Sequence, residues 1–225
     1  MTAENNIPKN ATQLPELVLE ATLYTSEQLR RQTPQGVQLA LVGRSNVGKS
    51  SLLNALARRK QLAKISSTPG KTRSVNLFRV APDGFCLADL PGYGYARRSK
   101  QERQDWGKLI ESYLLKTDEM AGIVLLLDCR LPPQEADKIM ADFARGHGIP
   151  VLPILTKADK CTQRERAARQ QEWAMFLQGK LALPVSAKTG QGISALWQAL
   201  RQAAGSPYAQ AGPAQTTNRA DEKTA

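Results

Sequence analysis

The residues that could bind a phosphate group lie close together early in the chain. They fit the spacing G-x-x-x-x-G-K-[ST] and are Gly43, Arg44, Ser45, Asn46, Val47, Gly48, Lys49 and Ser50. Glycines at these positions let backbone N–H groups converge on phosphate oxygens, and the N-terminus of a following helix favours the anion. We expect Lys49 to reach the β- and γ-phosphates of a nucleotide, and the Ser50 hydroxyl to bind Mg²⁺.

The sequence also predicts the strand and the helix that position this loop. An apolar run over residues 37–42 predicts a buried strand before the loop. Leu52, Leu53 and Leu56 begin an apolar stripe after it, so we expect a helix from Lys49 to about Arg58. A chance match in a glycine-containing turn is the alternative, but strand, turn and helix in this order are the context that the motif requires.

Three further groups could complete a magnesium and phosphate site. Asp89 closes a predicted strand and can hold Mg²⁺ through water, while Gly92 can offer its backbone N–H to a γ-phosphate. Thr72 lies in the loop after the first helix and can add its hydroxyl to the metal shell. Hard oxygen ligands together with phosphates are what Mg²⁺ prefers.

Two polar segments could select the base. They close two later predicted strands and read Thr156-Lys157-Ala158-Asp159 and Ser186-Ala187-Lys188. The Asp159 carboxylate can accept hydrogen bonds from the N1–H and the exocyclic amine of guanine, a donor pair that adenine lacks. The stem of Lys157 can lie against the ring, and the Ala187 N–H can meet the guanine O6. Each segment is common alone, but their order at successive strand ends predicts a guanine site.

Strands and helices alternate along the rest of the chain. Residues 75–80 and 85–89 flank a turn-rich sequence and predict a hairpin, and residues 121–127, 151–155 and 181–185 predict buried strands. Amphipathic helical stripes lie between and after them. We therefore predict an α/β fold with three layers, in which helices cover both faces of a mostly parallel six-stranded sheet with one antiparallel strand.

We divide the chain into three parts. Residues 1–34 form a partly ordered extension with a short helix capped by Ser26, residues 35–204 the nucleotide-binding domain, and residues 205–225 a disordered tail without apolar periodicity. The N-terminal sequence lacks the features of a signal peptide, and the longest apolar run, residues 123–127, is too short to cross a bilayer. We expect a cytoplasmic protein, without membrane insertion, that is a monomer.

The charge balance indicates a polyanionic partner. The chain has 31 Lys+Arg against 20 Asp+Glu, a net charge of +11. Basic clusters adjoin the two loops that would sense the γ-phosphate, at Arg58-Arg59-Lys60, Lys64, Lys71-Thr72-Arg73 and Arg97-Arg98-Ser99-Lys100. We expect these loops to present a basic face to a nucleic acid or another anionic surface. The alternative for each cluster is a solvated surface.

The cysteines and the single histidine do not form a metal site. Cys86, Cys129 and Cys161 lack C-x-x-C spacing and a histidine partner, and His147 stands between two glycines. We expect free thiols in a reducing compartment, used as small apolar side chains.

The combined motifs resemble those of the translation-factor-related GTPases. The loop ending at Ser51, together with Asp89-Leu90-Pro91-Gly92-Tyr93-Gly94-Tyr95-Ala96, is most similar to the bacterial EngB (YihA/YsxC) GTPases. Thr68-Pro69-Gly70-Lys71-Thr72 resembles the first switch of that family. The resemblance covers about residues 15–205, and it implies a Ras-like P-loop GTPase fold.

The resemblance also implies a function and its residues. It implies Mg²⁺-dependent binding of GTP and GDP, a role in assembling the large ribosomal subunit on pre-50S particles, and an association with cell division and septation. The implied metal ligands are Ser50, Thr72 and Asp89, and the implied catalytic groups are Lys49, Thr72 and Gly92. The implied nucleotide-binding residues are Gly43, Arg44, Ser45, Asn46, Val47, Gly48, Lys49, Ser50, Ser51, Gly70, Lys71, Thr72, Arg73, Ser74, Asp89, Leu90, Pro91, Gly92, Thr156, Lys157, Ala158, Asp159, Ser186, Ala187 and Lys188.

Two positions bear on how GTP would be hydrolysed. The residue after D-x-x-G is Tyr93, where many switch GTPases have a glutamine that orients water, so we predict slow intrinsic hydrolysis. Asn46 resembles the residue with which related GTPases bind a potassium ion beside the phosphates. The alternative is that Asn46 only shapes the turn.

Two cellular functions remain open from the sequence. In the first, the chain is a switch that binds pre-ribosomal particles and leaves after hydrolysis. In the second, GTP gates a scaffold at the division site, and turnover is incidental. A P-loop kinase is a third option, but it would leave Asp159 and the segment 186–188 without a role.

Overall fold

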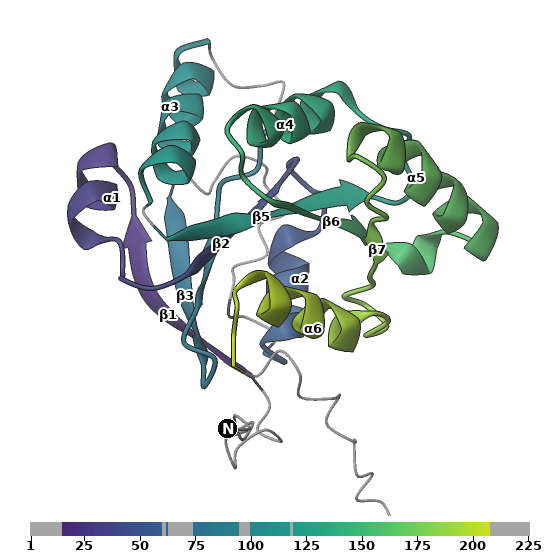
Figure 1. Ribbon diagram of the computed structural model, residues 1–225, viewed down its shortest axis with the longest axis horizontal. Coiled ribbons are helices and arrows are strands. Elements are labelled where there is room, and N and C mark those ends of the chain that lie inside the picture. The colour runs from purple at the N-terminus through teal and green to yellow at the C-terminus, as the bar shows by residue number, and fades with distance from the viewer. Residues whose placement is uncertain (1–14, 60–61, 63–73, 95–99, 118, 208–225) are drawn as a thin grey trace, which may run out of the picture.

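The computed structural model describes residues 15–59, 62, 74–94, 100–117 and 119–207 (Figure 1). The described residues contain one seven-stranded sheet with the order β1-β3-β4-β2-β5-β6-β7. The strands are β1 (Glu16–Leu23), β2 (Gln38–Gly43), β3 (Val75–Ala81), β4 (Cys86–Asp89), β5 (Met120–Asp128), β6 (Val151–Thr156) and β7 (Leu183–Pro184). Strand β3 runs antiparallel to both of its neighbours, and every other neighbouring pair is parallel.

The α/β class, the mostly parallel sheet and the single antiparallel strand are confirmed, but the expected count of six strands was wrong. The seventh strand is β1, which pairs with β3 at the edge of the sheet. Only Leu17 and Leu23 of β1 are buried, and its register shifts between Leu19 and Ala21. An edge strand with a bulge and mostly exposed side chains lacks the two-residue alternation by which strands are recognised in a sequence.

Helices cover both faces of the sheet, as Figure 1 shows. The helices α1 (Ser26–Gln32), α3 (Lys100–Lys116), α4 (Glu135–Gly146) and α5 (Gln163–Phe176) pack on one face, while α2 (Lys49–Leu56) and α6 (Ile193–Ala203) pack on the other. Each face has its own core. Tyr113 and Trp173 belong to the first core, and Leu53 and Leu196 belong to the second.

The segments on either side of the predicted domain, residues 35–204, differ in detail from the sequence expectation. Thr25, rather than Ser26, caps α1, and its hydroxyl accepts a hydrogen bond from the Gln28 N–H. At the other end, the Ser206 hydroxyl donates to Asp83 Oδ1 at 2.6 Å, so the chain still packs on the domain beyond residue 205, where we expected the tail to begin. Residues 1–14 and 208–225 lie outside the described residues.

The parallel arrangement determines where polar side chains meet. Strands β2, β4, β5 and β6 end at Gly43, Asp89, Asp128 and Thr156, and their carboxyl ends share one edge of the sheet. Within the described part of the chain, no helix is long and apolar enough to span a membrane.

Candidate nucleotide-binding site

The loop between β2 and α2 has a backbone that only certain residues can adopt. A Cβ atom on Gly43 would lie 2.9 Å from Val47 Cγ1 and 3.0 Å from the Leu126 carbonyl oxygen, so this position has no room for a side chain. Gly48 caps α2 with φ 108°, and Asn46 has φ 65°. Within the described structure the N-cap residue Gly48 makes no side-chain cap hydrogen bond to the first turn of α2, and the N-terminus of a helix favours an anion.

Two of the predicted phosphate and metal residues form a buried ion pair. The Lys49 ammonium binds Asp89 Oδ1, and their side chains are only 9% and 5% exposed. Lys49 begins α2 and Asp89 ends β4, so the parallel pairing of β2 with β4 sets their approach. The structure therefore brings the predicted phosphate-binding lysine and the predicted metal carboxylate to one point.

The D-x-x-G segment lies directly against the phosphate loop. The Ser45 N–H donates to the Tyr93 carbonyl at 2.9 Å, and the Tyr93 N–H donates to the Gly43 carbonyl at 3.2 Å. A Cβ atom on Gly92 would lie 3.0 Å from the backbone N and Cα of Ser45. Glycine at position 92 is thus required by the close approach of two backbones.

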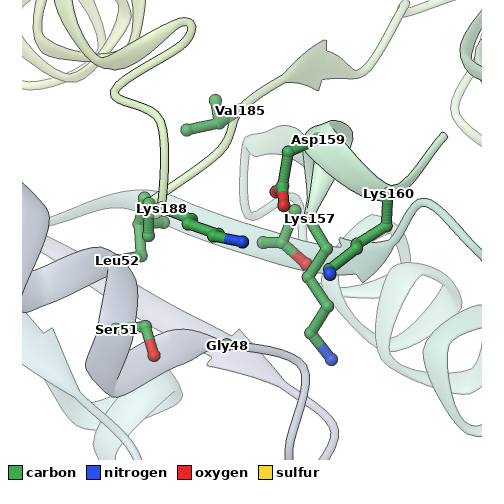
Figure 2. Close-up of a pocket in the computed structure, with 10 residues that line it drawn as sticks. Gly48, Ser51, Leu52, Lys157, Asp159, Lys160, Val185 and Lys188 are labelled. Atoms are coloured by element: carbon green, nitrogen blue, oxygen red, sulfur yellow. The ribbon is translucent and has the colours of Figure 1, made fainter. Parts of the chain in front are cut away.

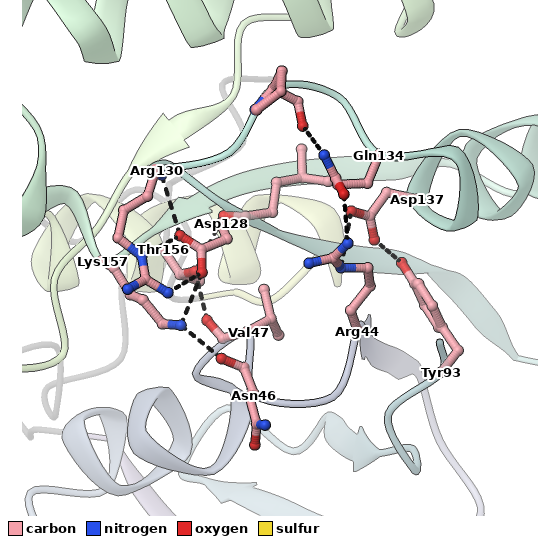
Figure 3. Close-up of polar contacts among 12 residues, drawn as sticks. Arg44, Asn46, Val47, Tyr93, Asp128, Arg130, Gln134, Asp137, Thr156 and Lys157 are labelled. Atoms are coloured by element: carbon pink, nitrogen blue, oxygen red, sulfur yellow. Dashed lines mark hydrogen bonds and ion pairs between the residues drawn. The ribbon is translucent and has the colours of Figure 1, made fainter. Parts of the chain in front are cut away.

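The Tyr93 side chain points away from the phosphate loop. Its hydroxyl donates to Asp137 Oδ1 at 2.8 Å, and Arg44 reaches the same helix, donating to Gln134 Oε1 at 2.8 Å (Figure 3). Burial is the main cause that raises the pKa of Tyr93 well above its usual value, and the Asp137 carboxylate adds to it. Burial also raises the pKa of Asp137, against the opposing effects of Tyr93 and Arg44. The sequence did not single out Asp137, because acidic residues are common in the first turn of a helix, where they interact favourably with the helix dipole.

The two base-recognition segments meet at one pocket. A cavity of about 170 Å³ is lined by Gly48, Ser51, Leu52, Thr156, Lys157, Asp159, Lys160, Val185, Ala187 and Lys188 (Figure 2). The Ser186 hydroxyl donates to Asp159 Oδ1 at 2.7 Å, which is the main cause that lowers the pKa of Asp159. The same Ser186 oxygen accepts the Lys188 N–H at 3.2 Å. A fixed, ionised Asp159 can accept hydrogen bonds from a ligand in this pocket.

Lys157 and Thr156 connect this pocket to the phosphate loop through hydrogen bonds. The Lys157 ammonium donates to the Asn46 carbonyl at 2.6 Å and to Asp128 Oδ2 at 2.8 Å. The Thr156 hydroxyl donates to the Val47 carbonyl at 2.7 Å. Figure 3 shows Lys157 spanning from β6 to the loop. These hydrogen bonds connect the end of β6 to the loop between β2 and α2.

Asp128 and Arg130 are two site residues that the sequence reasoning missed. Arg130 donates from Nε and Nη2 to the two Asp128 oxygens, at 2.9 and 2.8 Å. Burial would raise the pKa of Asp128, but the hydrogen bonds from Arg130 and Lys157 lower it to about 2. The sequence signal that could have identified Asp128 is a carboxylate at the end of a predicted buried strand, the same feature that identified Asp89.

The remaining predicted residues are placed as follows. Ser50 and Ser51 lie in the first turn of α2, Leu90 is buried beside Pro91, and Ser74 is buried directly before β3. Gly70, Lys71, Thr72 and Arg73 lie outside the described residues, as do Lys60, Lys64 and residues 97–99 of the basic clusters. Among the described residues, no three His, Cys, Asp or Glu side chains gather to hold a metal.

Comparisons with known proteins agree with this geometry. Residues 38–157 match the family described as 50S ribosome-binding GTPase. The chain is 54% identical over 214 residues to a probable GTP-binding protein EngB of Nitratidesulfovibrio vulgaris, which covers 93% of this chain and 98% of that protein. It is 43% identical over 188 residues to the corresponding protein of Geobacillus kaustophilus, covering 81% and 96%.

Solved structures give the same fold. A crystal structure of a probable GTP-binding protein EngB aligns with a TM-score of 0.64 at 22% identity, covering 74% of this chain and 98% of that one. The identity to the curated relatives extends over most of this chain and most of theirs. The chain belongs to the EngB family of P-loop GTPases.

Proposed function

We propose that this chain binds GTP and GDP with Mg²⁺, hydrolyses GTP slowly, and acts as a switch in assembly of the large ribosomal subunit. The observation that carries the nucleotide part is the pair of contacts from Lys157 to Asn46 and from Thr156 to Val47. They join an anion-binding loop to a pocket with an ionised carboxylate. A guanine nucleotide satisfies both ends, whereas adenine would leave Asp159 without its donor pair.

The residues present suit a magnesium ion beside the phosphates. Ser50 would offer its hydroxyl, Thr72 would offer a second one, and Asp89 would act through water. The ion would neutralise phosphate charge. In the described structure the Lys49 ammonium forms an ion pair with Asp89. We propose that Lys49 binds the phosphates instead when a nucleotide is present, so that the Asp89 carboxylate can hold the ion through water.

The position of Tyr93 supports slow intrinsic hydrolysis. Its hydroxyl donates a hydrogen bond to Asp137, and the residue is only 6% exposed, so the side chain is not placed to orient an attacking water. Backbone groups and the lysine can bind the γ-phosphate without this help, which separates binding from turnover. A partner that supplies a water-orienting group would accelerate the reaction.

We propose that the Asn46 side chain can bind a potassium ion. The Asn46 carbonyl accepts Lys157, and Figure 3 shows the side chain pointing away from that contact. This leaves the amide oxygen as a ligand for a cation beside the phosphates, where its charge would add to that of Lys49. The alternative remains that Asn46, with φ 65°, serves only to shape the turn.

The ribosomal role is supported by charge and by relatives. A net charge of +11 suits a polyanionic partner such as ribosomal RNA, and the matching family is described as ribosome-binding. A structural neighbour, Era, aligns with a TM-score of 0.63 at 22% identity over 75% of this chain and 56% of its own. It was crystallised with MgGDPNP and nucleotides 1506–1542 of 16S ribosomal RNA. We place the switch, as a monomer, in the cytoplasm on pre-50S particles.

Sedimentation with ribosomal particles tests this proposal. We expect the full chain to be retained on large-subunit precursors with a non-hydrolysable GTP analogue and released with GDP, with retention falling steeply as salt rises. Asp159→Asn serves as the matched variant, because it should lose the guanine response without altering the basic surface. Retention that does not depend on the nucleotide would favour the second candidate, a GTP-gated scaffold for cell division and septation.

A further inference from the structure

Asp137 is a buried carboxylate on a helix that supplies none of the predicted nucleotide-binding residues. It lies in the first turn of α4, and its side chain is only 4% exposed. Burying a carboxylate costs free energy unless hydrogen bonds or opposite charges compensate for it. Here the Tyr93 hydroxyl donates to Oδ1 at 2.8 Å, and Arg44 Nε lies 3.8 Å from Oδ2 (Figure 3). Both partners belong to the predicted phosphate site, because Arg44 is in the phosphate loop and Tyr93 follows Gly92.

A second contact links the same helix to the phosphate loop. Gln134 is the N-cap residue of α4, but its side chain makes no cap hydrogen bond. Its Oε1 instead accepts from Arg44 Nη1 at 2.8 Å, and its Nε2 donates to the Pro132 carbonyl at 2.9 Å. The start of α4 therefore holds Arg44 through a neutral acceptor and through the Asp137 carboxylate.

The D-x-x-G segment contacts both the phosphate loop and α4. Arg44 and Tyr93 form an isolated parallel β-bridge, which continues the pairing of β2 with β4. A Cβ atom on Gly94 would lie 3.8 Å from Arg44 Cγ and 4.0 Å from Ala136 Cβ. A change in the contacts of α4 would therefore be transmitted to the backbone of residues 92–94.

Hydrogen bonds to the phosphate loop fix the backbone around the Gly92 N–H. The Tyr93 N–H donates to the Gly43 carbonyl at 3.2 Å, and the Ser45 N–H donates to the Tyr93 carbonyl at 2.9 Å. The Ser45 hydroxyl donates to the Gly92 carbonyl at 3.4 Å. Within the described part of the chain, the Gly92 N–H itself has no hydrogen-bond partner. The group that we expect to donate to a γ-phosphate is thus available at a defined position.

We propose that Asp137 is a positioning residue for recognition of the γ-phosphate. It holds Tyr93 and Arg44 so that the Gly92 N–H is ready to bind the third phosphate of GTP. GDP has no γ-phosphate, so its binding does not use this contact. The inference rests on the proposed GTP-binding function and adds to it a residue that does not line the base pocket.

The effect arises from preorganisation of the D-x-x-G segment. Without Asp137, the Tyr93 hydroxyl loses its acceptor and the Arg44 guanidinium loses its charged partner. The segment then populates further conformations, and GTP must select the one in which Gly92 faces the γ-phosphate. The apparent affinity for GTP falls in proportion to the population of that conformation, whereas the affinity for GDP does not depend on it.

Competition titrations on the full chain test this proposal. A fluorescent GDP analogue is displaced by GDP and by a non-hydrolysable GTP analogue, both with Mg²⁺. We expect Asp137→Ala to lower the affinity for the GTP analogue by about tenfold and to leave the GDP affinity within about twofold of wild type. Asp137→Asn keeps an oxygen that can accept from the Tyr93 hydroxyl, so it should recover part of the loss. Asp142→Asn breaks an exposed pair with Arg145 on the same helix and is the matched control, expected to behave as wild type.

Tyr93→Phe gives a second measurement that does not depend on the folding of Asp137→Ala. It removes the hydroxyl and keeps the ring, and it should also weaken binding of the GTP analogue without weakening binding of GDP. The double variant should bind the analogue about as weakly as Asp137→Ala alone, because both substitutions remove the same hydrogen bond. Far-UV circular dichroism checks that each variant is folded.

The outcomes separate this inference from the proposed function. Equal losses of affinity for GDP and for the GTP analogue would overturn the inference, because they would show that Asp137 only supports the fold. An unchanged or higher affinity for the GTP analogue in folded Asp137→Ala or Tyr93→Phe would also overturn it, while wild-type binding of both nucleotides would leave the proposed function intact. If wild type binds neither nucleotide, the proposed function itself fails and the inference fails with it.

Discussion

The Lys157 ammonium lies between the Asn46 carbonyl, at 2.6 Å, and Asp128 Oδ2, at 2.8 Å. One lysine thus connects the phosphate loop, the base-recognition segment and the end of the central strand β5. Arg130 donates to both oxygens of the same carboxylate. Side chains at the ends of β5 and β6 therefore hold the phosphate loop against the pocket proposed to bind the base.

Replacing Asp128 should weaken nucleotide binding, although Asp128 does not line the proposed pocket. Asp128→Asn leaves Lys157 with one fewer charged partner, and we expect GDP affinity to fall by about tenfold. Fluorescent GDP titration measures it. Asp142→Asn breaks an exposed pair with Arg145 on α4 and is the control, expected to change affinity little. Equal affinities for the wild type and Asp128→Asn would show that Lys157 is positioned by the loop alone.

The same carboxylate should contribute to acid sensitivity. Its pKa is lowered from an ordinary 3.8 to about 2 in the folded chain, so its stabilising effect is present above pH 4 and is lost as pH falls toward 2. The contribution is at most about 2 kcal/mol. Urea unfolding at several pH values should therefore show a smaller loss of unfolding free energy between pH 4 and 2 for Asp128→Asn than for wild type. A parallel decline in both proteins would exclude Asp128 as a source of the acid effect.

The Tyr93 hydroxyl should matter for stability and not for turnover. Tyr93→Phe leaves the buried Asp137 without one donor, and we expect a loss of about 1–3 kcal/mol in unfolding free energy. Phosphate release from GTP should remain as slow as in wild type. Tyr113→Phe, which removes another buried hydroxyl bonded to Gln38, is the control and should also destabilise. Rapid hydrolysis by wild type, or a large change of rate in Tyr93→Phe, would refute the assignment of slow hydrolysis to this side chain's position.

Potassium should accelerate hydrolysis if Asn46 binds the ion. We expect faster phosphate release in K⁺ than in Na⁺ at equal ionic strength, and expect Asn46→Ala to abolish the difference while GDP binding persists. The physical reason is an added positive charge beside the γ-phosphate. Equal rates in the two salts would leave Asn46 with the role of shaping the turn.

The sequence predicted much of this fold because its strongest patterns are local. The buried runs of β2, β5 and β6, and the glycines of the phosphate loop, have steric causes within a few residues. Strand β1 was missed because an edge strand buries only Leu17 and Leu23. Contacts across long sequence separations were missed for another reason, since nothing near Tyr93 indicates Asp137, and nothing near Lys157 indicates Asp128. The family and fold class are confirmed, whereas the individual roles of the site residues remain predictions.

The preference for guanine tests the central claim most directly. In Asp159→Asn the carboxylate that we propose accepts two guanine donors becomes an amide, which can instead donate to the 2-oxo group of xanthine. We predict that GDP affinity falls by about 100-fold or more while xanthosine diphosphate affinity rises. Titration of both nucleotides against wild type and Asp159→Asn measures this exchange. Unchanged GDP affinity in the variant would contradict the assignment of this pocket to guanine.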